Sequence, residues 1–332
     1  MQCKIGVFSC QAYDQKTLNQ ASEHHKGAEL KYFETTLNEQ SVSLCQGLDT
    51  VCVFVNDTVN ESVIIALAKS GVRHIALRCA GYNNIDLKAA KKYGLCVSRV
   101  PAYSPHSVAE HAIALMLTLN RKTHRAFNRV REGNFNLNGL MGFTLHGKRV
   151  GVVGTGHIGK ATANILKGFG CTVLCCDPQP DSSLAAECTY TSFDDILQTC
   201  DIITLHCPLN DDTFHLIDHH NINQMKDGVM LINTSRGALI DTKAMIEGLK
   251  SEKIGSLGID VYEQEASLFF TDHSMDIIHD DIFERLQTFP NVLITGHQGF
   301  FTREAMEEIA TTTLANIVHF CQGTLSEHNR VI

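Results

Sequence analysis

The chain alternates short β-rich apolar runs with longer amphipathic segments of helical length. This alternation is typical of parallel sheets with helices on both faces. In the first third, amphipathic helices are expected near residues 14–24, 60–70 and 86–92. The expected strands lie near residues 3–9, 29–33, 50–55, 74–78 and 95–98, and then near 149–153, 171–177, 201–206, 229–233, 256–261 and 292–295.

The strands fall into two series, and the second series begins at Lys148. A chain of 332 residues is too long for one core of ordinary size, so we expect two doubly wound α/β domains. The segment Thr302–Gln322 reads as a helix that returns to the first domain. Both connections would then lie near Val100–Pro101 and Gly299–Phe300, which suits a hinged interdomain cleft that closes on a substrate.

A long apolar helix is expected between the two series. Ser104 is placed to cap this helix, and Pro105 suits its first turn, where a missing N–H is tolerated. Two apolar stripes follow: Val108, Ala112, Leu115 and Leu119 on one side, and Ala109, Ile113, Met116 and Leu117 on the other. A helix that is apolar all round must be buried. Either a core position or packing between its own domain and a second subunit explains the pattern.

The strongest single motif is a glycine turn at the start of the second series. The apolar run from Lys148 leads directly into GxGxxG at Gly154, Gly156 and Gly159, and a helical segment follows. These glycines would allow a tight turn, a close backbone approach to a pyrophosphate, and close packing of helix on strand. The N–H groups of His157 and Ile158 would point at the phosphates from the helix N-terminus.

The next expected strand ends in Asp177, 18 residues after Gly159. A carboxylate at this point can accept hydrogen bonds from ribose hydroxyls and would repel a 2′-phosphate, so NAD is preferred to NADP. We therefore expect a Rossmann NAD-binding domain over residues 101–299. Residues 1–100 and 300–332 are expected to form a flavodoxin-like substrate domain.

Charge and composition exclude several classes of partner. The net charge of −8 repels nucleic-acid phosphates, and the basic stretch Arg121–Arg131 is better read as a solvated helix end. No apolar run is long enough to cross a bilayer, so no membrane partner is expected. The N-terminus enters a strand-like run without the features of a signal peptide, which favours a cytoplasmic protein.

The 13 cysteines and 17 histidines show no metal or disulfide pattern. Several cysteines, including Cys52, Cys171, Cys175 and Cys176, lie in apolar strand-like runs, where free thiols act as small hydrophobes. There is no CxxC and no HExxH motif. We expect reduced structural thiols and no bound metal.

Three expected strands of the second series end in groups that suit hydride transfer to a 2-keto acid. The run from Val229 ends in Arg236, whose guanidinium can grip a carboxylate by two hydrogen bonds. The run from Val292 ends in His297, a natural proton donor near neutral pH. A third run ends in an acidic cluster at Glu263 and Glu265, and a carboxylate beside the histidine would favour the imidazolium.

At these residues the chain resembles the D-2-hydroxyacid dehydrogenases. Ser235–Gly237, Asp260–Glu265 and Gly296–Gln298 look like the three catalytic signatures of that family. The resemblance covers nearly the whole chain, including Arg78–Asp86 and Val100–Pro105. It is closest to the branch of bacterial fermentative D-lactate dehydrogenases, because Gly296 replaces the proline of many other branches and Gln-Gly-Phe-Phe follows His297.

The resemblance implies a role for each matching residue. Arg236 would bind the substrate carboxylate and carbonyl, Glu265 rather than Glu263 would pair with the histidine, and His297 would be the acid/base. Further substrate contacts would come from the backbone of Ala80 and Gly81 and from pocket walls at Phe54, Tyr103 and Phe300. The implied NAD contacts, beside the three glycines, are His157, Ile158, Asp177, Cys207, Pro208, Thr213, Thr234, Ser235, Arg236 and Asp260, with Asp260 at the nicotinamide carboxamide.

The activity that follows from this resemblance is the reversible, NADH-dependent reduction of pyruvate to D-lactate by a homodimer or homotetramer. Reduction of hydroxypyruvate, glyoxylate or a branched 2-keto acid stays open, because one methylene changes discrimination in an apolar pocket by only about 1–3 kcal/mol. A non-catalytic, NAD-sensing interaction protein is the alternative from another class, since fold alone does not decide function. The set of Arg236, Glu265 and His297 favours an enzyme.

Overall fold

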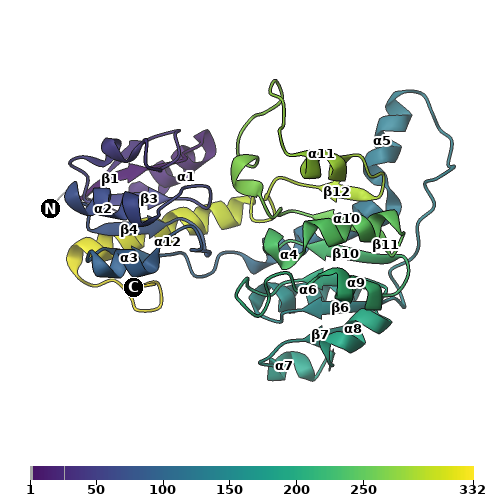
Figure 1. Cartoon of the computed structure of the whole chain (residues 1–332). Coiled ribbons are helices and arrows are strands. Elements are labelled where there is room, and N and C mark those ends of the chain that lie inside the picture. Colours follow the sequence, from purple (N-terminus) through teal and green to yellow (C-terminus); the bar gives the residue numbers. More distant parts are fainter. Residues whose placement is uncertain (1–2, 26) are drawn as a thin grey trace. The chain divides into compact units, whose positions relative to one another are not determined.

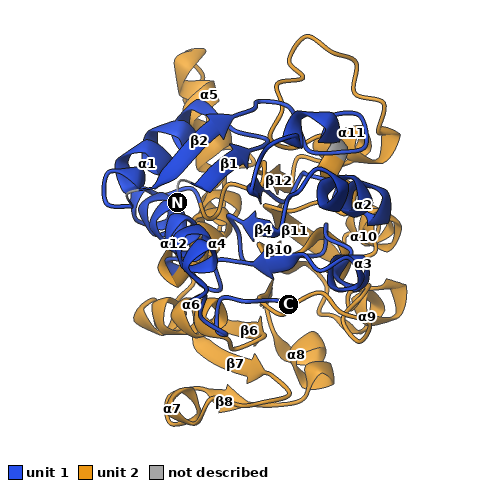
Figure 2. Ribbon diagram, turned by 90° about the vertical axis from the view of Figure 1, so that its left-hand side faces the viewer, with its two compact units in different colours: residues 1–104, 301–332 blue, residues 105–300 orange. Residues whose placement is uncertain are grey.

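The computed structural model describes residues 3–25 and 27–332. The chain forms two compact units, one of residues 1–104 and 301–332 and one of residues 105–300 (Figures 1 and 2). The segment after residue 98 stays with the first unit, because the N–H of Arg99 bonds to Asn329 and that of Val100 bonds to Cys79. No helix among the described residues is both long and apolar enough to span a bilayer.

The first unit is built on a five-stranded parallel sheet in the order β2-β1-β3-β4-β5. This is the flavodoxin-like strand order, as expected from the sequence. Helices α1 and α12 cover one face of the sheet, and α2 and α3 lie on the other (Figure 2). The elements are β1 (Cys3–Val7), α1 (Ala12–Ser22), β2 (Ala28–Tyr32), the 3₁₀ helix η1 (Val42–Cys45), β3 (Thr50–Val53), α2 (Glu61–Lys69), β4 (His74–Leu77), α3 (Leu87–Lys92), β5 (Cys96–Ser98) and α12 (Arg303–Gln322).

The second unit is built on a seven-stranded parallel sheet in the order β12-β11-β10-β9-β6-β7-β8. Counted from β6, this is the doubly wound Rossmann order with the chain reversing between β6 and β9. Its strands are β6 (Arg149–Val153), β7 (Thr172–Cys176), β8 (Thr189–Tyr190), β9 (Ile202–Leu205), β10 (Val229–Asn233), β11 (Ile254–Ile259) and β12 (Val292–Ile294). Its helices are α4 (Pro105–Arg121), α5 (Thr123–Arg131), α6 (His157–Gly168), α7 (Ser182–Ala185), α8 (Phe193–Thr199), α9 (His219–Gln224), α10 (Thr242–Lys250) and α11 (Asp281–Gln287), with 3₁₀ helices η2 (Gly237–Leu239) and η3 (Glu265–Ser267).

Helix α4 is a core helix of the second unit. It packs on α6 and against β10 and β11, and Ala112, Ile113, Leu115, Met116 and Leu119 all belong to one buried cluster on this face of the sheet. A second cluster gathers α8, α9, α10 and α11 against the opposite face. Burial inside its own unit therefore accounts for these five side chains of α4, and packing of the helix against a second subunit stays a prediction.

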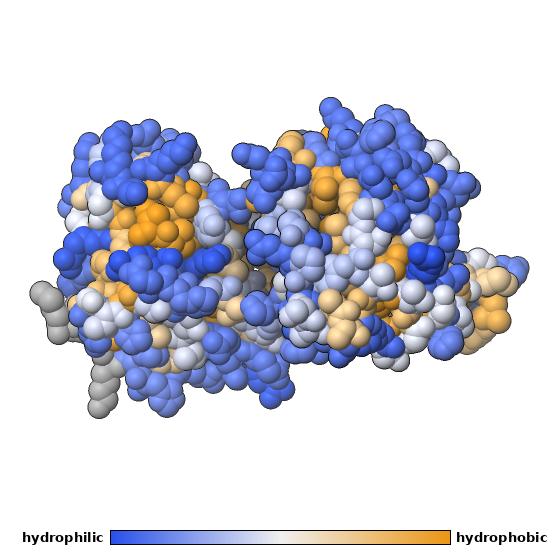
Figure 3. All heavy atoms as spheres, turned by 90° about the horizontal axis from the view of Figure 1, so that it is seen from below, coloured by the Kyte–Doolittle hydropathy of each residue, from blue (hydrophilic) through white to orange (hydrophobic). Residues whose placement is uncertain are grey.

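The segment of residues 123–143, here called the arm, stands apart from these cores. Lys122 adopts a left-handed conformation with φ of 49°, which separates α4 from α5. Helix α5 has no buried residue, and apolar side chains of the arm stay exposed: Phe127 (62%), Phe135 (74%), Leu137 (78%) and Met141 (87%). Apolar atoms also gather at the right-hand end of Figure 3, the end at which Figure 1 shows α5. The arm is thus an apolar surface with no cover inside the chain's described residues.

A buried guanidinium ties together the loops at the carboxyl edge of the first sheet. Arg78 follows β4, is 2% exposed, and lies 3.5 Å from the carboxylate of Asp14. Its Nη2 donates to the backbone oxygen of Ser9 at 2.7 Å, and its Cζ lies 4.7 Å from the ring centroid of Phe54. The neighbouring Asp57, whose pKa is raised by burial, accepts hydrogen bonds from Ser9 Oγ and from the N–H of Phe54. The loops after β1, β3 and β4 therefore share one buried charge cluster.

Loss of this cation should destabilise the first unit strongly. Arg78→Met keeps an aliphatic side chain but leaves Asp14 buried without its counter-charge, which typically costs about 3 kcal/mol or more. We expect a clear loss of unfolding free energy in urea denaturation followed by circular dichroism. Lys92→Met is the matched control, because Lys92 pairs with Glu61 at the surface, where both side chains are more than half exposed. Equal losses in the two variants would contradict the role given to Arg78.

Candidate active site and cofactor site

The glycine turn joins β6 to α6 in the second unit. Gly154 has φ of +91°, and a Cβ there would lie 2.5 Å from the backbone nitrogen of Cys207. A Cβ on Gly159 would lie 1.9 Å from the carbonyl oxygen of Gly154, so both positions require glycine. Gly156 is the N-cap of α6, and open space surrounds the Cβ position there. The first-turn N–H groups, those of His157 and Ile158 included, have no partner within the helix and can bind a phosphate.

Asp177 follows β7 and lies beside this turn. Its Oδ2 accepts a hydrogen bond from the N–H of Thr155 at 2.6 Å, and its Oδ1 accepts one from the N–H of Gln179 at 2.8 Å. These two bonds fix the carboxylate at the carboxyl edge of the sheet, where the sequence predicts the ribose contact. The acid thus braces the glycine turn as well as facing the space next to it.

A cavity of about 500 Å³ opens along the glycine turn and Asp177. Six of the residues expected to contact the cofactor line it: Gly154, Gly156, Asp177, Cys207, Pro208 and Thr213. The rest of the wall has no cofactor role predicted from the sequence and is formed by Val153, Cys176, Pro178, Gln179, Phe193, His206, Asn210, Asp212 and Leu216. Most of these follow strand ends or sit in loops, and nothing in their local pattern distinguishes them from other loop residues.

His206 is the most informative of the wall residues that had no predicted role. It lies at the carboxyl end of β9, its Nε2 is 2.9 Å from Thr204 Oγ1, and burial lowers its pKa to about 4. Among the described residues no partner contacts its buried Nδ1, and the buried hydroxyl of Thr234 is likewise unsatisfied. Buried polar atoms usually find partners. His206 lines the cavity at the glycine turn, where an unsatisfied buried nitrogen fits a polar ligand of the dinucleotide kind.

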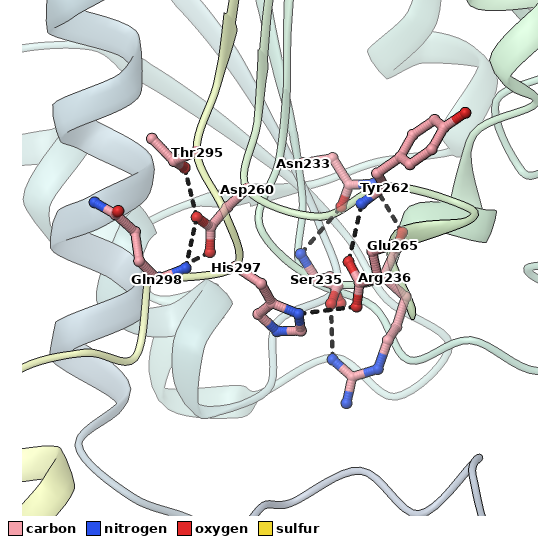
Figure 4. A network of polar contacts seen from close by, with 10 residues as sticks. Asn233, Ser235, Arg236, Asp260, Tyr262, Glu265, Thr295, His297 and Gln298 are labelled. Carbon is pink, nitrogen blue, oxygen red and sulfur yellow. Dashed lines mark hydrogen bonds and ion pairs between the residues drawn. The ribbon is translucent and has the colours of Figure 1, made fainter. Parts of the chain in front are cut away.

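Arg236 is carried by a loop that begins where β10 ends at Asn233. The Asn233 side chain accepts from the N–H of Ser235 at 3.0 Å and donates to the carbonyl of Arg236 at 2.8 Å. Ser235 Oγ donates to the carbonyl of Cys207 at 2.7 Å, and Arg236 Nη1 donates to the carbonyl of Ser235 at 2.7 Å. Figure 4 shows this bracing and the guanidinium projecting away from the strand ends. The loop is therefore held in one conformation before any ligand binds.

Gly237, the last residue of the Ser-Arg-Gly sequence, lies where a side chain would not fit. A Cβ at this position would lie 2.1 Å from the backbone carbon of Tyr262. Only glycine lets the loop after β10 approach the loop after β11 so closely. This contact brings the segment that carries Arg236 next to the segment that carries Glu265.

His297 and Glu265 form a direct pair. His297 Nδ1 lies 2.9 Å from Glu265 Oε1, and Glu265 Oε2 accepts from the N–H of Tyr262 at 3.0 Å (Figure 4). Their side chains are 17% and 22% exposed, so solvent screens the pair only in part. Glu263 is engaged elsewhere, because it accepts from Thr242 and lies 2.9 Å from His215. Glu265, and not Glu263, is thus the hydrogen-bond partner of His297.

Asp260 organises the loop that presents His297. It is 1% exposed, and its carboxylate accepts from Thr295 Oγ1 at 2.5 Å and from the N–H groups of Gln298 and Gly299 at 2.9 and 2.7 Å. Burial alone would raise its pKa, but hydrogen bonds from His111 and Thr295 outweigh burial and lower the pKa below its usual value. Its two oxygens are therefore occupied by the protein. The nicotinamide contact predicted for Asp260 stays a prediction.

His297 itself has φ of 54°, a left-handed conformation that is uncommon for a side chain of this size. Its backbone N–H bonds to the carbonyl of Asp260 at 2.7 Å, which holds the turn. Two aromatic rings flank the imidazole, Phe270 at 5.6 Å and Phe300 at 6.4 Å between centroids. Phe300 was expected to be a pocket wall, whereas Phe270 lies in a loop that gave no sequence signal.

The other residues predicted for substrate binding lie in the first unit. Phe54 is buried after β3, and Tyr103 is half-buried near the end of the unit. The carbonyls of Ala80 and Gly81 are held by Arg99 Nη1 at 3.0 Å and by Cys79 Sγ at 3.2 Å. Their part in binding a substrate, like the predicted cleft, stays a prediction.

Comparison with known proteins places this site in a family. Residues 113–299 match the family described as D-isomer specific 2-hydroxyacid dehydrogenase, NAD binding domain. This range contains the glycine turn, Asp177, Arg236, Glu265 and His297. NAD is therefore the cofactor, in agreement with the prediction from the sequence.

Whole-chain relatives agree with the domain match. A D-lactate dehydrogenase of Escherichia coli (strain K12) is 51% identical over 321 residues, covering 96% of this chain and 97% of the relative. A solved structure described as the pyruvate reductase of Chlamydomonas reinhardtii has 44% identity and a TM-score of 0.91, covering 97% of each chain. An NAD-complexed D-isomer specific 2-hydroxyacid dehydrogenase from Lactobacillus delbrueckii ssp. bulgaricus has 29% identity and a TM-score of 0.80, covering 99% of this chain and 100% of that one. The chain thus belongs to the D-isomer specific 2-hydroxyacid dehydrogenase family and is an NAD-dependent oxidoreductase.

Proposed function

We propose that this enzyme is a D-lactate dehydrogenase that reduces pyruvate to D-lactate with NADH, reversibly. The observation that carries the proposal is the His297–Glu265 pair, 2.9 Å apart, on loops beside the one that presents Arg236. The similarity to a D-lactate dehydrogenase of E. coli and to a pyruvate reductase of Chlamydomonas supports pyruvate as the keto acid.

The proposed roles follow from charge and hydrogen-bonding capacity. The Arg236 guanidinium holds the substrate carboxylate by paired, charge-assisted hydrogen bonds. His297, through the ring nitrogen that Glu265 does not contact, donates a proton to the oxygen that becomes an alkoxide. Glu265 favours the protonated imidazole in the reduction direction and orients its ring. In lactate oxidation the same imidazole accepts the hydroxyl proton.

The proposed NAD contacts are those that surround the glycine turn. When bound, the cofactor supplies or accepts the hydride. The N–H groups at the start of α6 hold its phosphates, and Asp177 accepts from its ribose hydroxyls. The buried hydroxyl of Thr234 and Nδ1 of His206 are left to bond to the ligand. The further proposed contacts are Cys207, Pro208, Thr213, Ser235, Arg236 and Asp260.

The direct test is NADH oxidation against a panel of pyruvate, hydroxypyruvate, glyoxylate and a branched 2-keto acid, with chiral analysis of the product. We expect the highest kcat/KM with pyruvate and D-lactate as the product. His297→Ala should lower kcat/KM by about 10²- to 10⁴-fold, the usual contribution of general acid catalysis, with NADH binding unchanged by fluorescence titration.

His215→Ala is the matched control for this variant. His215 also lies 2.9 Å from a glutamate, Glu263, in the same unit, so its loss removes an equivalent pair without touching His297. We expect it to retain most of the turnover. Near-normal activity of His297→Ala, or preference for another keto acid in the panel, would overturn the corresponding part of the proposal.

The choice of NAD over NADP is proposed to rest on Asp177. Asp177→Ala removes the charge that repels a 2′-phosphate, so the ratio of kcat/KM for NADH to that for NADPH should fall. Asp212→Ala is the control, because Asp212 lines the same cavity and carries the same charge. A similar fall in both variants would assign the preference to the summed charge of the cavity instead of to Asp177.

We also propose that the enzyme is a cytoplasmic homodimer or homotetramer that associates through the arm of residues 123–143. Exposed apolar surface of this kind marks sites of contact between proteins, which supports the proposed interface. The thirteen cysteines are free thiols, as in a reducing compartment, which supports the cytoplasmic location. The double variant Phe135→Ser with Leu137→Ser should shift the mass measured by light scattering toward the monomer. An unchanged mass would remove the arm from the interface.

A further inference from the structure

Two thiols from opposite ends of the sequence meet in the first unit. Cys3 is the first residue of β1, and Cys321 is the penultimate residue of α12. Their Sγ atoms lie 2.7 Å apart, although 318 positions separate them in sequence. A disulfide bond has a length of about 2.05 Å, so the two sulfurs need to approach by only about 0.7 Å.

We propose that Cys3 and Cys321 are a redox-sensitive pair that forms a disulfide when a peroxide reaches Cys321. The bond links the last turn of α12 covalently to β1. This pair is a covalent modification site that does not depend on the substrate of the enzyme.

The two thiols differ in access, which sets the order of events. Cys321 is exposed, whereas Cys3 is 5% exposed. Burial, followed by the hydrogen bond with Cys321, raises the pKa of Cys3 to about 12, so Cys3 stays protonated and unreactive toward dissolved oxidants. An oxidant therefore meets Cys321 first.

The chemistry balances with a hydroperoxide as the oxidant. The Cys321 sulfur attacks the peroxide, the O–O bond breaks, and a sulfenic acid and an alcohol (water for hydrogen peroxide) form. The Cys3 sulfur then attacks the Cys321 sulfur, the S–O bond breaks, and the Cys3 proton leaves with the hydroxide as water. The two thiols lose two electrons in total, and the peroxide gains them. A dithiol reductant reverses the bond by exchange.

A second pair of thiols in contact shows that solvent exposure of one thiol, and not the contact alone, is needed for oxidation. Cys175 and Cys188 in the other unit also share a hydrogen bond, and burial and this bond raise the pKa of Cys175 to about 12. These residues are 0% and 8% exposed, so neither thiol presents itself to an oxidant. The Cys175–Cys188 pair is thus an internal control, with a thiol contact but no access.

The position of the pair predicts what closure does. Helix α12 packs against α1 and β4, and Ala310, Leu314 and Ile317 on it share a buried cluster with Cys3. A bond between residues 3 and 321 encloses nearly the whole chain in one loop, which restricts the unfolded state more than a short loop does. Closure should therefore stabilise the fold against heat and denaturant.

Closure should not alter turnover. Cys3 begins β1 at the amino edge of the sheet, whereas the loops that carry Phe54, Ala80 and Gly81 follow the carboxyl ends of β3 and β4. In a parallel sheet these two edges are opposite. The Cys3–Cys321 disulfide should accordingly stabilise the fold under oxidative conditions without changing the activity.

The test treats the full chain with hydrogen peroxide and compares intact mass, peptide maps after alkylation, and Tm. We expect loss of the mass of two hydrogen atoms, a Cys3–Cys321 cross-linked peptide, and a Tm higher by several degrees that dithiothreitol reverses. Cys175 and Cys188 should stay alkylatable after unfolding, and kcat/KM should change less than twofold. Cys321→Ser, at an exposed position that tolerates the change, should abolish both the cross-link and the rise in Tm.

Three outcomes would overturn the proposal. One is a Cys321 that oxidises to sulfinic acid while Cys3 remains a thiol. Another is a cross-link that forms without raising the Tm. The third is an equal rise in Tm after oxidation of Cys321→Ser, because the stabilisation would then come from a different pair of cysteines. Cys3→Ser distinguishes the first case, since it should allow sulfinic acid to form at Cys321 where the wild type gives a disulfide.

Discussion

Parallel strand direction is the constraint on which the site of the second unit depends. Because β6, β7, β9, β10, β11 and β12 all run the same way, every residue that follows a strand emerges at one edge of the sheet. Groups as distant in sequence as Gly154, Arg236 and His297 thus share that edge. Gly237 then removes the last steric obstacle, since any side chain there would overlap the backbone at Tyr262. The loops after the neighbouring strands β11 and β12 are joined by two side-chain hydrogen bonds, Glu265 with His297 and Asp260 with Thr295.

In each unit a buried carboxylate holds loops at the carboxyl edge of the sheet by hydrogen bonds. Asp260 receives two backbone N–H groups and the Thr295 hydroxyl, and so sets the turn in which His297 adopts its left-handed conformation. Asp57 does the same in the first unit with the N–H groups of Phe54 and Leu37. An acid buried among donors is costly to displace. Each loop is therefore tied to a buried carboxylate by several hydrogen bonds, as a pre-organised site requires.

Cysteine takes two physical roles in the same chain. Most of the thirteen thiols fill the cores as small hydrophobes, and burial raises the pKa of many of them. Cys321 differs because it is exposed and touches a buried partner. The same side chain is inert in one environment and open to oxidation in the other, and neighbours and access decide which.

The sequence by itself determined the strands and the glycine turn, because hydrophobic period and turn-forming glycines are local, and it predicted Arg236, Glu265 and His297 as the catalytic side chains. All eleven expected strands form, and the resemblance singled out Glu265 over Glu263. Only the tertiary structure supplied β8, which has two residues, the separate helix α5, and the core position of α4, whose pattern fitted two environments equally. It also supplied Phe270 beside His297, His206 in the cofactor cavity and the contact of Cys3 with Cys321. These are contacts between segments far apart in the chain, and no local pattern of residues encodes which distant segments meet.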